Sequence, residues 1–297
     1  MADKATSKPT ALTVFDDGEG AGKFPILVND ATVITEAMQS LALNMGSRKL
    51  TIRNLQQVKM PTGGRTEWDY PTINGTESRK TIECVIVGVG TPRVFFESEF
   101  GKGERGAPPE CVSSDGITGD GLYGVNGERA RVGPQGAGSV RRIAGDCLMC
   151  PMNQWPPRGV AGRKKPCAEL TNLFFLAADE ESILPKYIRV TPGSKQSTED
   201  FLIQLGGTLV GGLTMPYYAA VIEVSLARQK SGGGFDYAQT AYRLVGRLSP
   251  SETAKMRAIA EGIAHLLGDT TVDRGDVEGV ASRDTDDATE GEYTVVN

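Results

Sequence analysis

The sequence contains a single histidine, His265, among 297 residues. Catalysis by Ser-His-Asp or Cys-His arrangements, and metal sites built on several histidines, therefore have almost no basis in this chain. No segment approaches the roughly 18 consecutive apolar residues that a membrane-spanning helix needs. Residues 1–14 also lack the apolar core of a secretory signal. We therefore expect a cytoplasmic protein without a membrane partner, in which cysteines more often bind metal or remain thiols than form disulfides.

Aromatic residues are few, at 6% of the chain, whereas glycine is abundant, with 37 residues. This glycine content exceeds the average share of about 7% and predicts long or numerous loops. The net charge of −5 is small but unevenly distributed: residues 269–292 contain nine acidic and two basic residues, whereas residues 128–167 contain eight basic and two acidic. A basic middle followed by an acidic tail favours interaction with a polyanion. A solvated loop face with a disordered terminus is the alternative.

The pattern of apolar residues predicts a mainly β, α+β fold. From residue 49 to 96, apolar positions alternate between short turns, which indicates an antiparallel sheet or a small barrel. Further strands are expected at 172–178 and 187–192, and a hairpin-like pair at 217–228 and 235–248. Helices are expected at 33–46, from Ser197 onward, and from Pro250, where Ser249 and Glu252 form a capping box. We assign residues 1–23 to a flexible N-terminus, 24–268 to one domain and 269–297 to a disordered acidic tail.

Four of the five cysteines lie in one stretch rich in Gly and Pro, residues 101–168. They are Cys111, Cys147, Cys150 and Cys167. A CxxC turn such as Cys147–Cys150 places two thiolates on one side of a tetrahedral site, and a distant pair completes it. The spacing therefore predicts one structural Zn²⁺. An iron–sulfur or redox site, or free thiols, are the alternatives, whereas Cys84 lies in a strand pattern and is expected to be buried.

Aromatic and basic residues alternate at several points around these cysteines. On an open β surface, exposed rings stack on unpaired bases while Arg and Lys contact phosphates. The candidate nucleic-acid contacts are Arg93, Phe95, Phe96, Arg129, Arg131, Arg141, Arg142, Trp155, Arg158, Arg163, Lys164 and Lys165. The alternative is that the rings belong to the core. Trp155 is the best candidate for stacking, because its segment is polar and interrupted by prolines.

Three segments resemble a known group of proteins: PPECVSSDG at 108–116, GDCLMCPMNQW at 145–155 and KKPCAELTNLFFL at 164–176. Together with a Pro-x-Ser step at 192–194, they resemble the CSxDG…CxxCPxxxWG…CxEL pattern of phage and mobile-element proteins. These are similar to the zinc-containing, OB-fold-like single-stranded DNA-binding proteins of phage replication. The chain departs from the pattern at Pro156-Pro157, where the group usually has Gly after the aromatic residue.

The resemblance implies a partly open antiparallel OB-like barrel with a zinc loop inserted at 101–168 and with flanking helices. It also implies non-catalytic binding of single-stranded DNA during replication or recombination of a phage-like genome, in the cytoplasm of a bacterial host. The acidic tail would then bind replication or recombination proteins. Two other classes stay open: a metal-dependent nuclease that uses Asp115 and Asp120, and a zinc-stabilised adaptor that binds a host protein through its tail.

Overall fold

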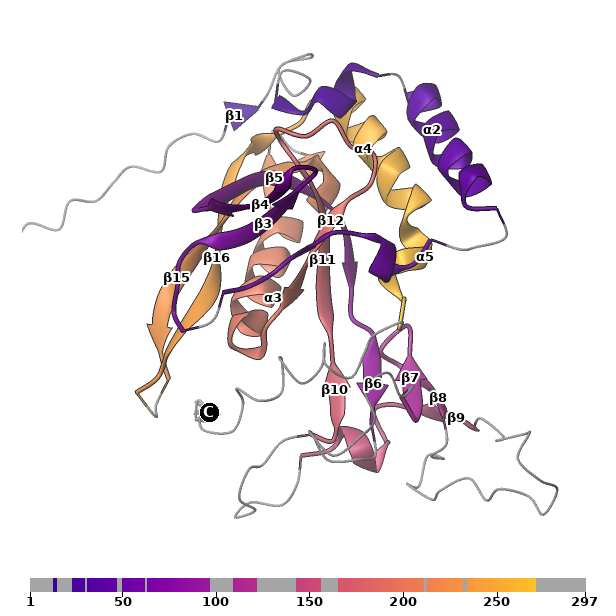
Figure 1. The fold of residues 1–297 in the computed structure, drawn as a ribbon, viewed down its shortest axis with the longest axis vertical. Helices are drawn as coiled ribbons and strands as arrows, with labels where there is room; N and C mark the ends of the chain where they lie inside the picture. Colours follow the sequence, from indigo (N-terminus) through magenta and orange to yellow (C-terminus); the bar gives the residue numbers. More distant parts are fainter. Residues whose placement is uncertain are drawn as a thin grey trace, which may run out of the picture.

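A computed structural model of the chain shows a mixed α+β fold built mostly of sheets (Figure 1). It describes residues 13–14, 23–29, 31–46, 50–61, 63–96, 109–121, 143–155, 165–210, 213–231 and 234–270. Most of the expected flexible N-terminus and acidic tail therefore lies outside the described residues. Within them, no helix has both the length and the apolar character needed to cross a bilayer.

A seven-stranded sheet in the order β1-β16-β15-β5-β11-β12-β2 forms the centre of the molecule. Its strands are β1 (Thr13–Val14), β2 (Gln57–Val58), β5 (Thr81–Gly90), β11 (Thr171–Ala177), β12 (Lys186–Val190), β15 (Ala220–Lys230) and β16 (Asp236–Arg247). The five inner strands pair antiparallel, whereas both edge strands pair in parallel. The described strands close into no barrel, so the expected OB-like barrel is not confirmed.

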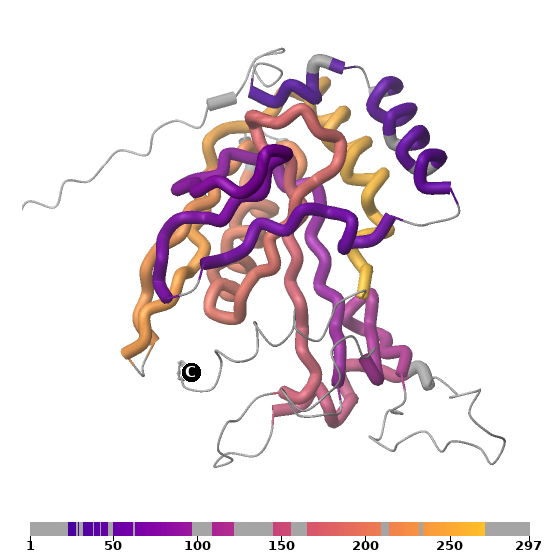
Figure 2. Tube along the Cα trace, viewed as in Figure 1, coloured from indigo at the N-terminus to yellow at the C-terminus, as the bar shows by residue number. Residues whose placement is uncertain are grey.

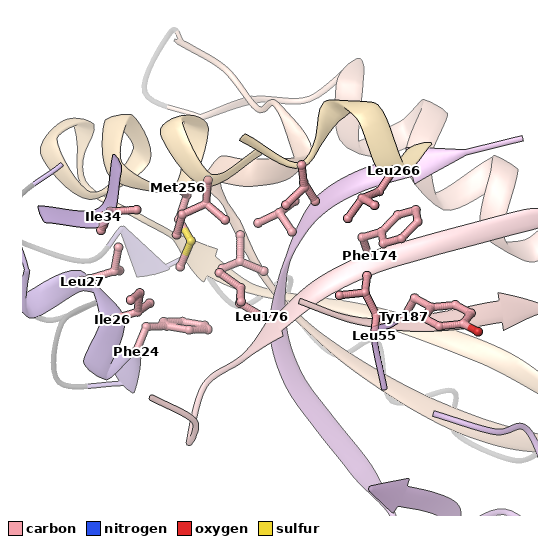
Figure 3. Packing of buried hydrophobic residues seen from close by; sticks show 14 of the residues in the cluster. Phe24, Ile26, Leu27, Ile34, Leu55, Phe174, Leu176, Tyr187, Met256 and Leu266 are labelled. Atoms are coloured by element: carbon pink, nitrogen blue, oxygen red, sulfur yellow. The ribbon is translucent and has the colours of Figure 1, made fainter. Parts of the chain in front are cut away.

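Apolar side chains alternate across this sheet and form one core on each face. On β5, Val85 and Val87 belong to the core beneath the helices α2 (Ala31–Asn44), α4 (Pro250–Gly262) and α5 (Ala264–Leu267). The same core includes a short 3-10 helix at Pro25–Val28 (Figure 3). Since α4 and α5 contact β5 directly and α2 contacts α4, α2 forms the outer layer on this side.

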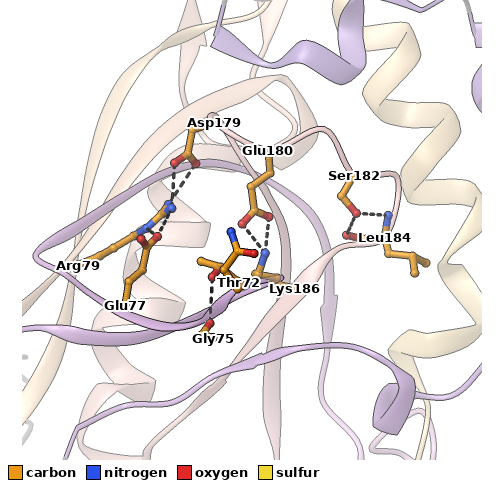
Figure 4. A network of polar contacts seen from close by, with 10 residues as sticks. Thr72, Gly75, Glu77, Arg79, Asp179, Glu180, Ser182, Leu184 and Lys186 are labelled. Carbon is orange, nitrogen blue, oxygen red and sulfur yellow. Dashed lines mark hydrogen bonds and ion pairs between the residues drawn. The ribbon is translucent and has the colours of Figure 1, made fainter.

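The opposite face is covered by α3 (Pro192–Gly206) and by the hairpin of β3 (Trp68–Thr72) and β4 (Gly75–Arg79). Trp68 and Tyr70 of this hairpin are completely buried. The guanidinium of Arg79 lies 3.8 Å from the centre of the Tyr70 ring. Glu77 and Asp179 form ion pairs with this guanidinium, and Lys186 forms one with Glu180 nearby (Figure 4). Burial raises the pKa of the Tyr70 hydroxyl, so this side chain stays neutral beside the Arg79 guanidinium.

Helix α3 begins at Pro192, five residues before the expected start at Ser197, and packs along β16. Ser194 accepts a hydrogen bond from the backbone N–H of Thr240 at 3.0 Å, and the Thr198 hydroxyl lies 2.7 Å from that of Tyr242. The first contact satisfies a backbone N–H of β16 that would otherwise be available for pairing with another strand.

The capping box of α4 is confirmed, because Ser249 accepts from the Glu252 amide and the Glu252 carboxylate accepts from the Ser249 amide. The helix turns at Ile263 and continues as α5. The end of α5 packs so closely on β5 that a Cβ added at Gly90 would lie 2.1 Å from the Leu267 carbonyl oxygen. Glycine at this position therefore allows the helix to reach the strand.

A second, five-stranded antiparallel sheet follows β5 and contains two of the four candidate ligands, with the other two in the turn after Asp146. Its strands, in the order β10-β6-β7-β8-β9, are β6 (Arg93–Phe95), β7 (Cys111–Ser113), β8 (Thr118–Gly121), β9 (Ile143–Asp146) and β10 (Cys167–Glu169). We call it the cysteine sheet. Its strands β7, β8 and β9 lie within residues 101–168, where a zinc loop was expected. The chain enters the sheet from β5 and leaves it into β11 (Figure 2).

One small sheet and three short helices complete the described part of the chain. A two-stranded sheet joins β13 (Leu209–Val210) to β14 (Leu213–Thr214). Short 3-10 helices are formed by Ile52–Asn54, Pro151–Asn153 and Tyr217–Ala219. The helix at Pro151–Asn153 follows the CxxC turn directly and positions the residues described next.

Candidate metal centre

The register of the cysteine sheet places two of the four cysteines on the same face. Phe95 of β6 lies opposite Cys111 of β7 on one side and opposite Cys167 of β10 on the other. Directly opposed residues of an antiparallel pair point to the same face of the sheet. The CxxC turn, Cys147 to Cys150, follows β9 and brings the other two thiols to this face, since all four cysteines line one cavity.

The cavity between the cysteines is small, with a volume of about 30 Å³. Gly119 forms part of its wall, and a Cβ added there would lie 3.3 Å from Sγ of Cys111 and 3.6 Å from Sγ of Cys147. A single ion fits this space, whereas an organic cofactor does not. Among the described residues, no three His, Cys, Asp or Glu side chains are arranged so that they hold a metal ion as they stand.

Hydrogen bonds fix the CxxC turn on the sheet. The Cys147 amide donates to the Ile117 carbonyl at 2.8 Å, and the Leu148 amide donates to the Asp146 carboxylate at 2.8 Å. Asn153, which is buried, donates from Nδ2 to the Cys147 carbonyl at 2.7 Å. The turn is therefore held from both sides before any metal binds.

Arg93 connects this turn to β10. Its Nη1 donates to Oδ1 of Asn153 at 2.5 Å, and its Nη2 lies 2.6 Å from a carboxylate oxygen of Glu169. Lys195 of α3 pairs with the same carboxylate. Arg93 also lines the cavity, and its side chain is only 15% exposed, so its observed contacts are to the site itself.

The thiols lie in an environment that disfavours their charged form. Burial, together with the neighbouring cysteines, raises the pKa of Cys111 to about 11. Burial also raises the pKa of Cys167 to about 12, although the Arg93 charge acts in the opposite direction. At neutral pH a metal cation therefore has to displace protons from these thiols when it binds. Four cysteine thiolates are a ligand set that Zn²⁺ takes in closed, structural sites.

Of the two aspartates of the nuclease hypothesis, Asp115 lies in the turn between β7 and β8 and Asp120 lies on β8. The Asp115 carboxylate accepts hydrogen bonds from the amides of Ile117 and Thr118 at 2.8 and 2.7 Å and from the Ser113 hydroxyl at 3.0 Å. The two amides in particular lower the pKa of Asp115 to about 2. Asp115 thus closes the turn between β7 and β8, whereas Asp120 lies on β8 near Cys111.

The candidate DNA contacts divide into three groups. Phe95 is buried, and Phe96 is partly buried and packs against a small core with Val94 and Leu170. Trp155 is 50% exposed, and Nζ of Lys165 lies 5.7 Å from the centre of its ring. The remaining seven candidates lie outside the described residues: Arg129, Arg131, Arg141, Arg142, Arg158, Arg163 and Lys164.

Sequence reasoning did not identify Asn153 and Glu169 as parts of the site. Asn153 contacts both the Cys147 carbonyl and Arg93, whereas Glu169 acts through Arg93. Glu169 is the Glu of the CxEL pattern, but the pattern gave it no role, and Asn153 is marked only by its position three residues after Cys150. Comparisons with known proteins found no matching family model, no matching curated protein and no matching solved structure. The function therefore has to be inferred from the site itself.

Proposed function

We propose that this chain binds single-stranded DNA without catalysing a reaction, during replication or recombination of a phage-like genome in a bacterial cytoplasm. One structural Zn²⁺, held by Cys111, Cys147, Cys150 and Cys167, would stabilise the cysteine sheet. The observation that carries the proposal is that these four cysteines line one cavity, in a part of the chain that also presents an exposed tryptophan with a lysine over its ring.

The ligand set supports a structural role for the metal. Four thiolates saturate a tetrahedral Zn²⁺ ion and leave no position for water or substrate, unlike the three-ligand sites of zinc enzymes. The strands of the cysteine sheet are only three or four residues long, and the small core beneath them has two fully buried residues, Val94 and Leu170. Such a small core contributes little stability, so a metal that joins β7, β10 and the CxxC turn compensates for it.

The distribution of charge supports a polyanionic ligand. Residues 122–142 contain four basic residues and one acidic residue, and residues 156–164 contain three basic residues and no acidic one. Both segments begin and end next to elements of the cysteine sheet in the sequence. Trp155 directly precedes the second segment. An exposed ring beside basic chain is the combination that binds single strands, because every base has a face that stacks and every nucleotide has a phosphate.

The nuclease hypothesis receives less support, because three hydrogen bonds to Oδ1 of Asp115 already hold this carboxylate in the turn between β7 and β8. The acidic tail is proposed to compete with DNA for the basic segments and to bind replication or recombination proteins when DNA displaces it. This part of the proposal depends on charge alone, with nine acidic residues between 269 and 292.

The experiment is a binding titration of a labelled poly-dT oligonucleotide with the metal-loaded full chain, together with metal analysis. We expect about one zinc per chain and binding that weakens with salt. Cys147→Ser should lose the zinc, whereas the matched control Cys84→Ala should retain it, since Cys84 is buried in the main sheet. Absence of oligonucleotide binding at low salt would refute the DNA proposal, and a folded protein without metal would refute the zinc proposal.

A further inference from the structure

A second exposed ring lies far from the cysteine sheet, at the tip of the β15–β16 hairpin. Phe235 is 69% exposed. Its amide donates to the Ser231 hydroxyl at 3.1 Å, and its carbonyl accepts from the Ser231 amide at 2.9 Å. Gly234, with φ +81°, allows the tight turn between them. The hairpin tip therefore presents an uncovered aromatic ring on a backbone that is already fixed.

Basic side chains surround this tip. Arg228 and Lys230 are exposed at the end of β15, and Arg65 is exposed on the neighbouring segment 63–67. Their carboxylate partners are weak ones: Arg65 lies 3.4 Å from Asp69, and Arg228 lies 3.4 Å from Asp236. Exposed ion pairs of this length contribute little stability. Each guanidinium has further N–H donors, so a phosphate can bind beside the carboxylate without displacing it.

The two arginines line a common groove. Gly64, Arg65, Thr66, Glu67 and Arg228 surround a surface groove of about 420 Å³. Segment 63–67 is held against the hairpin at Gly64, where an added Cβ would lie 2.8 Å from Cβ of Asp236 and 3.1 Å from Nε of Arg228. With φ +71°, this residue also has a backbone conformation that glycine favours. Two arginines therefore line the groove. Phe235 is adjacent to it in the chain, because the next residue, Asp236, packs against Gly64.

We propose that this groove and the neighbouring hairpin tip form a second contact site for single-stranded nucleic acid, in which Arg65 and Arg228 bind a phosphate in the groove and Phe235 at the tip stacks on an unpaired base. The inference rests on the proposed function and extends it to residues that the cysteine sheet does not include. Two guanidiniums match the shape and charge of a phosphate. A single exposed ring stacks well on the face of a base, whereas an apolar peptide side chain would need a wider apolar surface. Since a base can stack on a protein ring only when it is unpaired, the ligand is single-stranded.

The two sites lie beyond opposite ends of β5. The cysteine sheet follows Gly90, the last residue of β5. At the other end of β5, its first residue, Thr81, pairs with Ser225 of β15, and the β15–β16 hairpin continues beyond this pair to Phe235. Figure 1 shows the hairpin tip and the cysteine sheet on different sides of the molecule, with α3 between them. A short oligonucleotide is therefore expected to occupy one site at a time, and a long one to contact both.

The test uses the metal-loaded full chain and poly-dT of about 8 and about 30 nucleotides, since single-strand sites span roughly 4–16 nucleotides per module. For the longer probe, Phe235→Ala should weaken binding about 5- to 150-fold, the equivalent of one base that no longer stacks. The pair Arg65→Gln and Arg228→Gln should flatten the log–log salt slope by about 0.7 for each phosphate that the protein no longer binds. The matched controls are Ile203→Ala, which removes an exposed apolar side chain of α3, and Arg257→Gln, which removes an exposed arginine of α4.

A local probe reports on the hairpin tip directly. In a Trp155→Phe background, Phe235→Trp leaves one exposed tryptophan, because Trp68 is fully buried. Its fluorescence should be quenched when the longer oligonucleotide binds. If that oligonucleotide binds without quenching, and Phe235→Ala binds as tightly as Ile203→Ala, the second site is refuted while DNA binding stands. If the wild-type chain binds no oligonucleotide, the proposed function and the second site are both refuted.

Discussion

Asn153 offers the sharpest test of how the metal centre is built. Its buried side chain makes two hydrogen bonds, one to the Cys147 carbonyl at 2.7 Å and one from the Arg93 guanidinium at 2.5 Å. Asn153→Ala removes both. A neutral buried hydrogen bond contributes about 1 kcal/mol and one to a charged group about 1.5–3 kcal/mol, so the destabilisation is about 2–4 kcal/mol.

Because Asn153 holds the carbonyl of a metal ligand, much of this destabilisation should appear as weaker metal binding. Residues that orient ligands typically change metal affinity about 10- to 100-fold, the equivalent of about 1.4–2.7 kcal/mol. The measurement is a competition between the full chain and a chromophoric zinc chelator. We expect zinc to be released at a correspondingly lower chelator concentration from Asn153→Ala than from the wild type.

The neighbouring residue supplies a matched control. Gln154 also donates its side-chain amide to a carbonyl of the CxxC turn, that of Leu148 at 2.6 Å, but this bond is exposed to solvent. Water replaces such a bond readily, so Gln154→Ala should change zinc affinity by less than about 3-fold. Equal zinc affinities for Asn153→Ala and Gln154→Ala would refute the role assigned to the Arg93–Asn153 connection.

Three further outcomes follow from the same geometry. Trp155→Ala should weaken oligonucleotide binding by about 1–3 kcal/mol in an anisotropy titration, and an unchanged affinity would remove Trp155 from the interface. Zinc affinity should fall as pH falls. Below pH 8, Cys111 and Cys167 each bind a proton, because their pKa values are about 11 and 12, and zinc must displace both protons. These two thiols alone should lower the affinity about 100-fold per pH unit, and a pH-independent affinity would contradict this. Truncation after Thr270 removes eight acidic and two basic residues but keeps Asp269, whose carboxylate accepts from the Ile52 amide at 2.7 Å. The truncated chain should bind DNA more tightly at low salt, with a gain that disappears at high salt, and equal affinities at low salt would rule out competition by the tail.

The parts of the fold that sequence could predict are those specified by local patterns. The β15–β16 hairpin, the strands β11 and β12 and the helix α2 all fall within a few residues of their expected positions. Cys84 is buried as its strand pattern indicated. The start of α4 was predictable because Ser249 and Glu252 satisfy each other's backbone amides within four residues of chain.

Elements specified by distant contacts could not be predicted in this way. Helix α3 starts at Pro192, and its first turns are buried against β16 through the polar residues Ser194 and Thr198. Because polar residues occupy this inner face, the apolar pattern of a helix becomes visible only from Phe201 onward. Apart from β6, the strands of the cysteine sheet are too short to show alternation, and β8 and β9 also contain glycine. The pairing of β10 with β6 joins segments more than 70 residues apart, Cys167 with Phe95.

The same limit applies to the site. The shared cavity of the four cysteines and the exposure of Trp155 agree with the sequence pattern, because CxxC spacing and a proline-broken polar segment are local features. The burial of Phe95 and the internal partners of Arg93 are consequences of β6 lying between β7 and β10. Alternating aromatic and basic residues carry no information about which strands flank them.

Single-strand binding by the metal-loaded full chain is the measurement that tests the central proposal most directly. A labelled poly-dT oligonucleotide is titrated with protein at low salt, and the titration is repeated as salt is raised. We predict saturable binding whose logarithmic affinity falls linearly with the logarithm of salt concentration, by about 0.7 for each phosphate contacted. No change in anisotropy at low salt, with zinc bound and the protein folded, would contradict the assignment to single-stranded DNA.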